Sequence, residues 1–216
     1  MYIAGIDEAG RGPVVGPMVM AIVSVTIENL QKLETMGITD SKLLSPAKRE
    51  QLYKEIKAVA DEVFVVKESA KDIDTKRKKY SLNIIEVKQG ANLINMLKNV
   101  PKKIYVDCPD VNTGRYKETL YSYLDKHTDL VVEHKADYNY VVAGAASIIA
   151  KVERDNDIKE LERKLKVRIG SGYPSDPRTK EFIHNCVRQN KVPDCVRKSW
   201  QTYTNAKNKI KQKTLI

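Results

Sequence analysis

Four acidic residues stand where the chain is expected to end a strand or begin a helix. Asp7 and Glu8 close an apolar run of the kind found in buried strands, and Asp107 closes another. Asp137 comes just before a long helical pattern. Ligands of open α/β sheets bind in the crevice at the strand ends, so these carboxylates could converge on one site. Together they would repel one another strongly unless cations neutralised them.

Divalent ions held by such carboxylates could work as a pair. Two of them could activate a water molecule and stabilise the leaving oxygen in phosphodiester hydrolysis. Ligands that are all oxygen favour Mg²⁺ or Mn²⁺ over zinc. Strand-end and helix-cap carboxylates are nevertheless common, and distance along the sequence says little about convergence in space. On spacing alone the ordinary structural explanation is favoured.

A glycine-rich turn follows the first acidic pair. Gly10 and Gly12 flank Arg11, which would let the backbone approach a ligand closely and present its amides as hydrogen-bond donors. The segment does not match a dinucleotide-binding fingerprint, because Pro13 and Pro17 interrupt the pattern. A tight turn without a ligand is the simpler explanation.

Two further segments suit a nucleic acid. Ser147, Lys151 and Arg154 are spaced to share one helix face, where they could contact successive backbone phosphates. An exposed face balanced by nearby acidic residues explains the same spacing. The Gly and Pro content of Gly170–Pro177 predicts a constrained loop that carries Tyr173. The tyrosine ring could stack on a sugar or base, or simply anchor the loop.

Charge is spread unevenly along the chain. The 216 residues include 38 Lys and Arg against 28 Asp and Glu, a net charge of +10, and residues 151–216 alone hold +9. Clustered basic charge favours a polyanionic partner such as a nucleic acid, although a solvated charged surface would look the same.

The hydrophobic content of 42% excludes a wholly disordered chain. Three cysteines without metal-site spacing, no signal segment and no membrane-length apolar run predict a soluble, cytoplasmic protein.

Apolar runs bounded by Gly and Pro alternate with helical patterns along most of the chain. This order predicts an α/β fold, with a mixed β-sheet flanked by helices and a small helical region at the C-terminal end. The expected strands are Tyr2–Ile6, Met18–Ile27, Val63–Val66, Ile104–Val106 and Leu130–Glu133. The expected helices are one opened by Ser45 and Pro46, then Ser81–Asn99, Tyr116–Leu124, Tyr138–Val167 with a break near Asn156, and Ser175–Gln189. Lys207–Ile216 is expected to be a frayed basic tail.

Six segments carry a pattern that is more specific than any of them alone. They are Gly5–Pro13, Asp40-Ser41-Lys42, Asp107, Lys135–Asp137, Ala145–Lys151 and Gly170–Pro177. In this order the chain from Tyr2 to about Phe182 resembles ribonuclease HII, the type 2 ribonuclease H family, in its archaeal-like form. The resemblance implies a ribonuclease H-like catalytic core over residues 1–172 and a basic, mainly helical region over residues 173–216.

The resemblance also implies an activity. A protein of this family is expected to be a metal-dependent endonuclease. It would hydrolyse the RNA strand of RNA–DNA hybrids and incise 5′ to single ribonucleotides embedded in duplex DNA. The cuts would leave 3′-hydroxyl and 5′-phosphate ends and would serve primer and ribonucleotide removal. The implied partners are RNA–DNA hybrids and ribonucleotide-containing duplexes, and the protein is expected to act as a monomer.

Roles for single residues follow from the same resemblance. The family's metal ligands, expected to hold two Mg²⁺ or Mn²⁺ ions, match Asp7, Glu8, Asp107 and Asp137. Its Gly-Arg-Gly sensor of ribose 2′-hydroxyls matches Gly10, Arg11 and Gly12, and Tyr173 matches the tyrosine expected to stack on the following deoxyribose. The matching phosphate contacts are Lys42, Ser147, Lys151 and Arg154.

The C-terminal end departs from the family pattern. Archaeal relatives often end in a sliding-clamp motif with an aromatic pair, and Gln212–Ile216 lacks that pair, which argues against clamp binding.

Two other functions also fit the residues of the chain. One is a noncatalytic nucleic-acid-binding module that uses the basic C-terminal third, and the other is a related acidic-site nuclease that cuts DNA.

Overall fold

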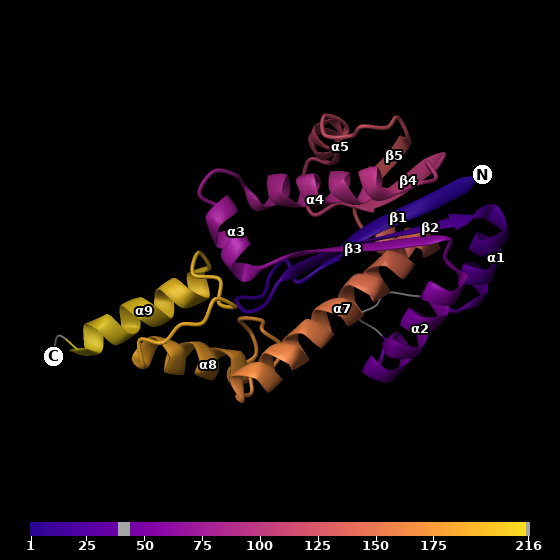
Figure 1. Ribbon diagram of the computed structural model, residues 1–216. Helices are drawn as coiled ribbons and strands as arrows, with labels where there is room; N and C mark the ends of the chain where they lie inside the picture. The colour runs from indigo at the N-terminus through magenta and orange to yellow at the C-terminus, as the bar shows by residue number, and fades with distance from the viewer. Residues whose placement is uncertain (39–43, 215–216) are drawn as a thin grey trace. The chain divides into compact units, whose positions relative to one another are not determined.

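The structure is a computed structural model that describes residues 1–38 and 44–214 (Figure 1). The strands are β1 (Tyr2–Ala9), β2 (Met18–Thr26), β3 (Glu62–Glu68), β4 (Lys103–Asp107) and β5 (Asp129–Glu133). The helices are α1 (Ile27–Thr35), α2 (Pro46–Val59), α3 (Ala70–Lys76), α4 (Leu82–Met96), α5 (Thr113–Tyr121), α6 (Ala136–Asn139), α7 (Val141–Leu165), α8 (Pro177–Arg188) and α9 (Gln201–Thr214). Asp40-Ser41-Lys42 and the last two residues of the chain lie outside the described residues.

The described strands form one five-stranded sheet in the order β3-β2-β1-β4-β5. β1 pairs antiparallel with β2, whereas β4 runs parallel to both β1 and β5. The predicted fold class, a mixed α/β sheet flanked by helices, is confirmed. Because Ile6 is paired with Val106, the next residues along, Asp7 and Asp107, come at the same end of two neighbouring strands.

Each face of the sheet is covered by its own apolar core. α4 and α5 cover one face with side chains such as Val87 and Leu120, while α1, α2 and the first part of α7 cover the other with side chains such as Leu33 and Ile149 (Figure 1). The approach of α7 to β1 depends on Gly5, because a Cβ atom there would lie 2.3 Å from the backbone nitrogen of Ala143. A helix that begins close to the sheet in this way can bring its own polar residues to the end of β1.

The chain folds into two compact units, each assembled from several segments. The first unit consists of Met1–Ala9, Val19–Lys67 and Ser81–Glu153, and the second of Gly10–Met18, Glu68–Tyr80 and Arg154–Ile216. The second unit has an apolar core of its own around Val14, Phe182 and Ile183. These units are interleaved in the sequence, whereas the division expected at residue 172 is consecutive, and that division stays a prediction.

The C-terminal segment differs from its expectation. The segment expected to fray from Lys207 onward is helical in α9 as far as Thr214, because Tyr203 and Ala206 pack against the core of the second unit. The break expected near Asn156 does not occur, and α7 continues to Leu165.

Besides α9, the helices α1 and α3 had no counterpart among the expected helices. α1 begins where the Thr26 hydroxyl accepts a hydrogen bond from the Asn29 amide, and α3 begins where Ser69 caps the Asp72 amide in the same way. Both are short, with little apolar periodicity to reveal them. Among the helices that the structure describes, none is both long and apolar enough to cross a membrane.

Candidate active site

Three of the four acidic residues meet at one end of the sheet. Asp7 and Glu8 lie near the end of β1, and Asp107 ends the neighbouring parallel strand β4. Each offers one carboxylate oxygen, and these three oxygens all lie within 4.8 Å of one another. The pairing of β1 with β4 therefore brings together carboxylates that are separated by about a hundred residues in the sequence.

Burial makes this group electrostatically unfavourable without a cation. Asp7 is 5% exposed, and burial, followed by the negative charges of Glu8 and Asp107, raises the pKa of its carboxyl well above the ordinary value. The Ser147 hydroxyl and the Glu8 amide donate hydrogen bonds to Asp7 and act in the opposite direction. Three oxygen donors that repel one another fit a divalent cation, which would neutralise them and be bound by ligands of the type it prefers.

Asp137 lies outside this group of three. It is half-buried in α6 and lines a pocket of about 400 Å³ together with Tyr105 and Tyr140. The residue before it, Ala136, donates its backbone N–H to Asp107 Oδ1 over 2.7 Å. Asp137 is thus tied through the backbone to one member of the group, although the structure does not bring its own carboxylate into it.

The side chains expected to share one face of α7, whether for phosphate contact or as a solvated face, are not exposed together. Ser147 is 6% exposed and bonds to Asp7, Lys151 is half-buried, and Arg154 is only 1% exposed. The reason is that α7 is a buried helix over most of its first half, so a face that looks polar in the sequence still contacts the protein. Contacts of these residues with phosphate stay predictions, as does that of Lys42, which lies outside the described residues.

The Gly10–Gly12 turn belongs to the second unit and has a conformation that requires glycine. Gly10 has a φ of +86°, and a Cβ atom there would lie 2.6 Å from the carbonyl oxygen of Pro17. Gly12 is exposed, and its Cβ position would be 3.7 Å from a ring carbon of Tyr173. The two features that the sequence singled out as ligand contacts are therefore neighbours within this unit.

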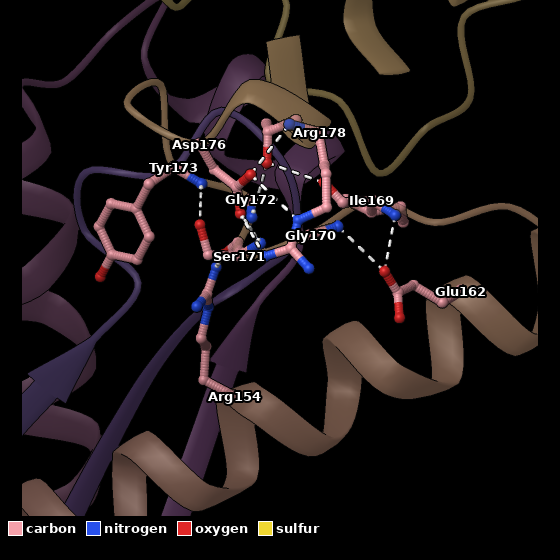
Figure 2. A network of polar contacts seen from close by, with 10 residues as sticks. Arg154, Glu162, Ile169, Gly170, Ser171, Gly172, Tyr173, Asp176 and Arg178 are labelled. Atoms are coloured by element: carbon pink, nitrogen blue, oxygen red, sulfur yellow. Dashed lines mark hydrogen bonds and ion pairs between the residues drawn. The ribbon is translucent and has the colours of Figure 1, made fainter. Parts of the chain in front are cut away.

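Tyr173 stands on a loop that is tightly held by polar contacts (Figure 2). Asp176 accepts hydrogen bonds from the amides of Ser171 and Arg178, over 2.8 and 2.9 Å. Glu162 of α7 accepts two more, from the backbone of residues 169 and 170. Arg154 extends from α7 toward the same loop (Figure 2), donates to the Ser171 carbonyl oxygen, and has its guanidinium 5.1 Å from the Tyr173 ring centre. The ring is thus presented from a rigid loop.

Two residues that the sequence analysis did not single out contact the Gly10–Gly12 turn. Arg197 donates to the carbonyl oxygens of Gly10 and Arg11, and Trp200 donates to that of Gly12. No motif spacing could have revealed them, because they stand nearly 190 residues away from the turn, in a segment whose basic composition predicts solvent exposure.

Comparison with known proteins gives a consistent result. The family model described as Ribonuclease HII matches residues 4–203. Ribonuclease HII from Thermococcus sibiricus is 41% identical over 98% of this chain and 94% of its own length. The crystal structure of ribonuclease H2 from Pyrococcus horikoshii OT3 is 38% identical, with a TM-score of 0.91 over 98% of this chain and 100% of that one. The ribonuclease HII in a PCNA:RNase HII complex from Archaeoglobus fulgidus is 40% identical, with a TM-score of 0.86 over 93% of this chain and 96% of that one.

The chain belongs to the ribonuclease HII family. It is accordingly a hydrolase of the ribonuclease H class, an endoribonuclease that acts on RNA–DNA. Enzymes of this class depend on divalent metal ions, and the group of Asp7, Glu8 and Asp107 supplies carboxylate ligands of the right type.

Proposed function

We propose that this ribonuclease, besides cutting the RNA strand of RNA–DNA hybrids, incises duplex DNA 5′ to a single embedded ribonucleotide. The products would carry a 3′-hydroxyl and a 5′-phosphate, and the reaction would take place in the cytoplasm. The observation that carries this proposal is that Gly12 and the Tyr173 ring are neighbours, since a Cβ atom placed on Gly12 would lie 3.7 Å from a ring carbon. It gives one unit both backbone amides for a ribose hydroxyl and an aromatic face for the next sugar.

The chemistry is assigned to the acidic residues. Asp7, Glu8 and Asp107, joined by Asp137, would hold two Mg²⁺ or Mn²⁺ ions. When bound, these ions would supply the positive charge that stabilises the phosphate in the transition state and lowers the pKa of the attacking water. Ser147 keeps the Asp7 carboxylate oriented through its hydroxyl, and the Ala136 amide does the same for Asp107. These residues are fixed before substrate arrives, as electrostatic catalysis requires.

Recognition is assigned to the sugar and not to the base. Gly10, Arg11 and Gly12 would meet the 2′-hydroxyl, the group that distinguishes ribose from deoxyribose. Tyr173 would lie against the deoxyribose that follows, with Arg154 holding the loop beneath it. Lys42 and Lys151 remain the proposed phosphate contacts, whereas the burial of Arg154 favours support of the Tyr173 loop.

The test is incision of a labelled duplex that contains one ribonucleotide, with Mg²⁺ or Mn²⁺. We expect one nick, 5′ to the ribonucleotide, whose ends are identified by ligation and by phosphatase treatment. EDTA should abolish the nick, and an all-DNA duplex of the same sequence is the matched control. Failure to cut the ribonucleotide duplex would contradict the proposal, and cutting of the all-DNA duplex would favour a DNA nuclease instead.

Tyr173 allows a sharper version of this test. Tyr173→Phe keeps the ring and should keep most of the incision of the single-ribonucleotide duplex, whereas Tyr173→Ala removes the stacking surface and should lower it about 10-fold or more. If the two variants behave alike, stacking is not the role of this residue.

A further inference from the structure

Arg197 is a fully buried cation whose described hydrogen bonds run to the backbone of one turn. It is 0% exposed. Its Nε donates to the Gly16 carbonyl oxygen over 3.0 Å, and its two terminal nitrogens donate to those of Arg11 and Gly10 over 2.9 and 2.6 Å. Burying a guanidinium costs free energy, which these charge-assisted hydrogen bonds must offset. Arg197 is therefore built to hold this turn in one conformation.

Trp200 binds the next carbonyl group of the same turn. Its indole N–H donates to the Gly12 carbonyl oxygen over 3.1 Å, and its ring lies 4.7 Å from the Arg197 guanidinium. The segment that carries both residues is itself fixed by Asp74, which accepts hydrogen bonds from the amides of Lys198 and Ser199. The carbonyl oxygens of three successive residues, 10 to 12, are thus all bound by one rigid segment.

Peptide geometry then decides where the amides point. None of the peptide bonds that the structure describes is cis, and in a planar trans peptide the N–H points opposite to the C=O of the residue before it. With the carbonyls of Gly10 and Arg11 directed at Arg197, the N–H groups of Arg11 and Gly12 are directed away from it. The plane that follows Gly12 offers no donor, because Pro13 has no N–H.

We propose that Arg197 and Trp200 are positioning residues that set the ribose selectivity of the enzyme by fixing the direction of these two amides. Neither residue touches the substrate; each acts through the turn. The inference rests on the proposed function, because it takes the 2′-hydroxyl oxygen as the acceptor that these two amides meet. It adds two residues to the specificity apparatus and gives the buried Arg197 a chemical purpose.

The experiment compares affinities for two duplexes that differ by one hydroxyl. Binding of a 20-base-pair duplex with one ribonucleotide, and of the all-DNA duplex of the same sequence, is measured by fluorescence anisotropy in EDTA. The variants are Trp200→Phe, which keeps the ring but removes the N–H, and Arg197→Lys, which keeps the charge but not the forked donors. Ile183→Ala is the control, because Ile183 is buried in the apolar core of the same unit and its truncation should destabilise that unit through packing.

The readout is the ratio of the two dissociation constants. For each variant we expect the preference for the ribonucleotide duplex to fall about two- to tenfold. This is the change in affinity that corresponds to the loss of one hydrogen bond. The Ile183→Ala control should keep the wild-type ratio even where its thermal stability falls further. Incision by the wild-type chain in Mg²⁺ is measured alongside.

The outcomes separate the two proposals. If the wild-type chain does not incise the single-ribonucleotide duplex, the proposed function fails. If it does incise, but Trp200→Phe keeps the wild-type affinity ratio, or the wild-type ratio is one, the positioning role is wrong and the proposed function stands. Trp200→Phe decides the question even if Arg197→Lys does not fold.

Discussion

Asp7→Asn is expected to stabilise the metal-free protein while removing its activity, because it relieves the repulsion between Asp7 and the neighbouring carboxylates. Asp7 is buried, and one of its oxygens lies within 4.8 Å of oxygens from two other carboxylates. Two unit charges at that distance repel by about 3.5 kcal/mol at an effective dielectric constant of about 20. Asp7 can escape the repulsion by binding a proton, which costs about 4 kcal/mol at pH 7 for a group with an ordinary pKa of about 3.9.

That protonation cost is the ceiling on what Asn can gain. Asn keeps a carbonyl oxygen for the Glu8 amide but gives up one carboxylate acceptor, a loss of about 1 kcal/mol. The net gain is about 2 to 3 kcal/mol, or roughly 5 to 10 °C in Tm for a chain of this size. Because the pKa of Asp7 is raised in the folded state, its penalty exists above the unfolded pKa and vanishes below it. The gain should therefore be present at pH 7 and absent near pH 4.

Thermal unfolding followed by circular dichroism in EDTA, at both pH values, measures this gain. Glu28→Gln is the control, since Glu28 is exposed on α1 and its ion pair with Lys32 should change stability little. Added Mg²⁺ should raise the Tm of the wild-type chain more than that of the variant, and incision should fall by at least about 100-fold. A lower Tm for Asp7→Asn at pH 7 in EDTA would contradict the predicted charge repulsion, and retained incision would contradict the catalytic role of Asp7.

Two further predictions concern the scaffold of the site. Gly5→Ala should lower the free energy of unfolding in urea by about 3 kcal/mol, because its Cβ would meet the backbone of Ala143 at 2.3 Å. Gly90→Ala is the control and should be neutral or stabilising, because its Cβ would make only 3.7 Å contacts. Equal effects of the two substitutions would contradict the packing argument. Hydrogen bonds, first of all from the Asn112 amide, lower the pKa of Asp110 to about 2, so its contribution to stability is present above about pH 4 and lost toward pH 2. Asp110→Asn should flatten the stability curve in that window, and an unchanged acid transition would show that the carboxylate has no such role.

Much of the fold was predictable because its strands and larger helices carry strong local signals. Buried runs of Val, Ile and Ala mark β1 and β2, and Ser45 with Pro46 marks the start of α2. The errors fall where local signals are weak or misleading. The basic composition of α9 predicts a solvated segment, yet its side chains Tyr203 and Ala206 pack against the apolar core of the second unit. The polarity of Arg154 likewise predicted exposure, although its guanidinium is buried beneath a loop.

Local patterns along the chain identified the available chemistry: an acidic pair after the first strand, a Gly-Arg-Gly turn, and a tyrosine on a constrained loop. Local composition is enough for such features, because strand ends and turns are marked by neighbouring residues. The folded structure was needed to show that Asp107 joins Asp7 and Glu8, that Asp137 lies outside their group, and that Arg197 holds the turn. Those outcomes depend on the parallel pairing of β1 with β4 and on which side chains the packed units bury. Both are long-range events that no local pattern along the chain encodes.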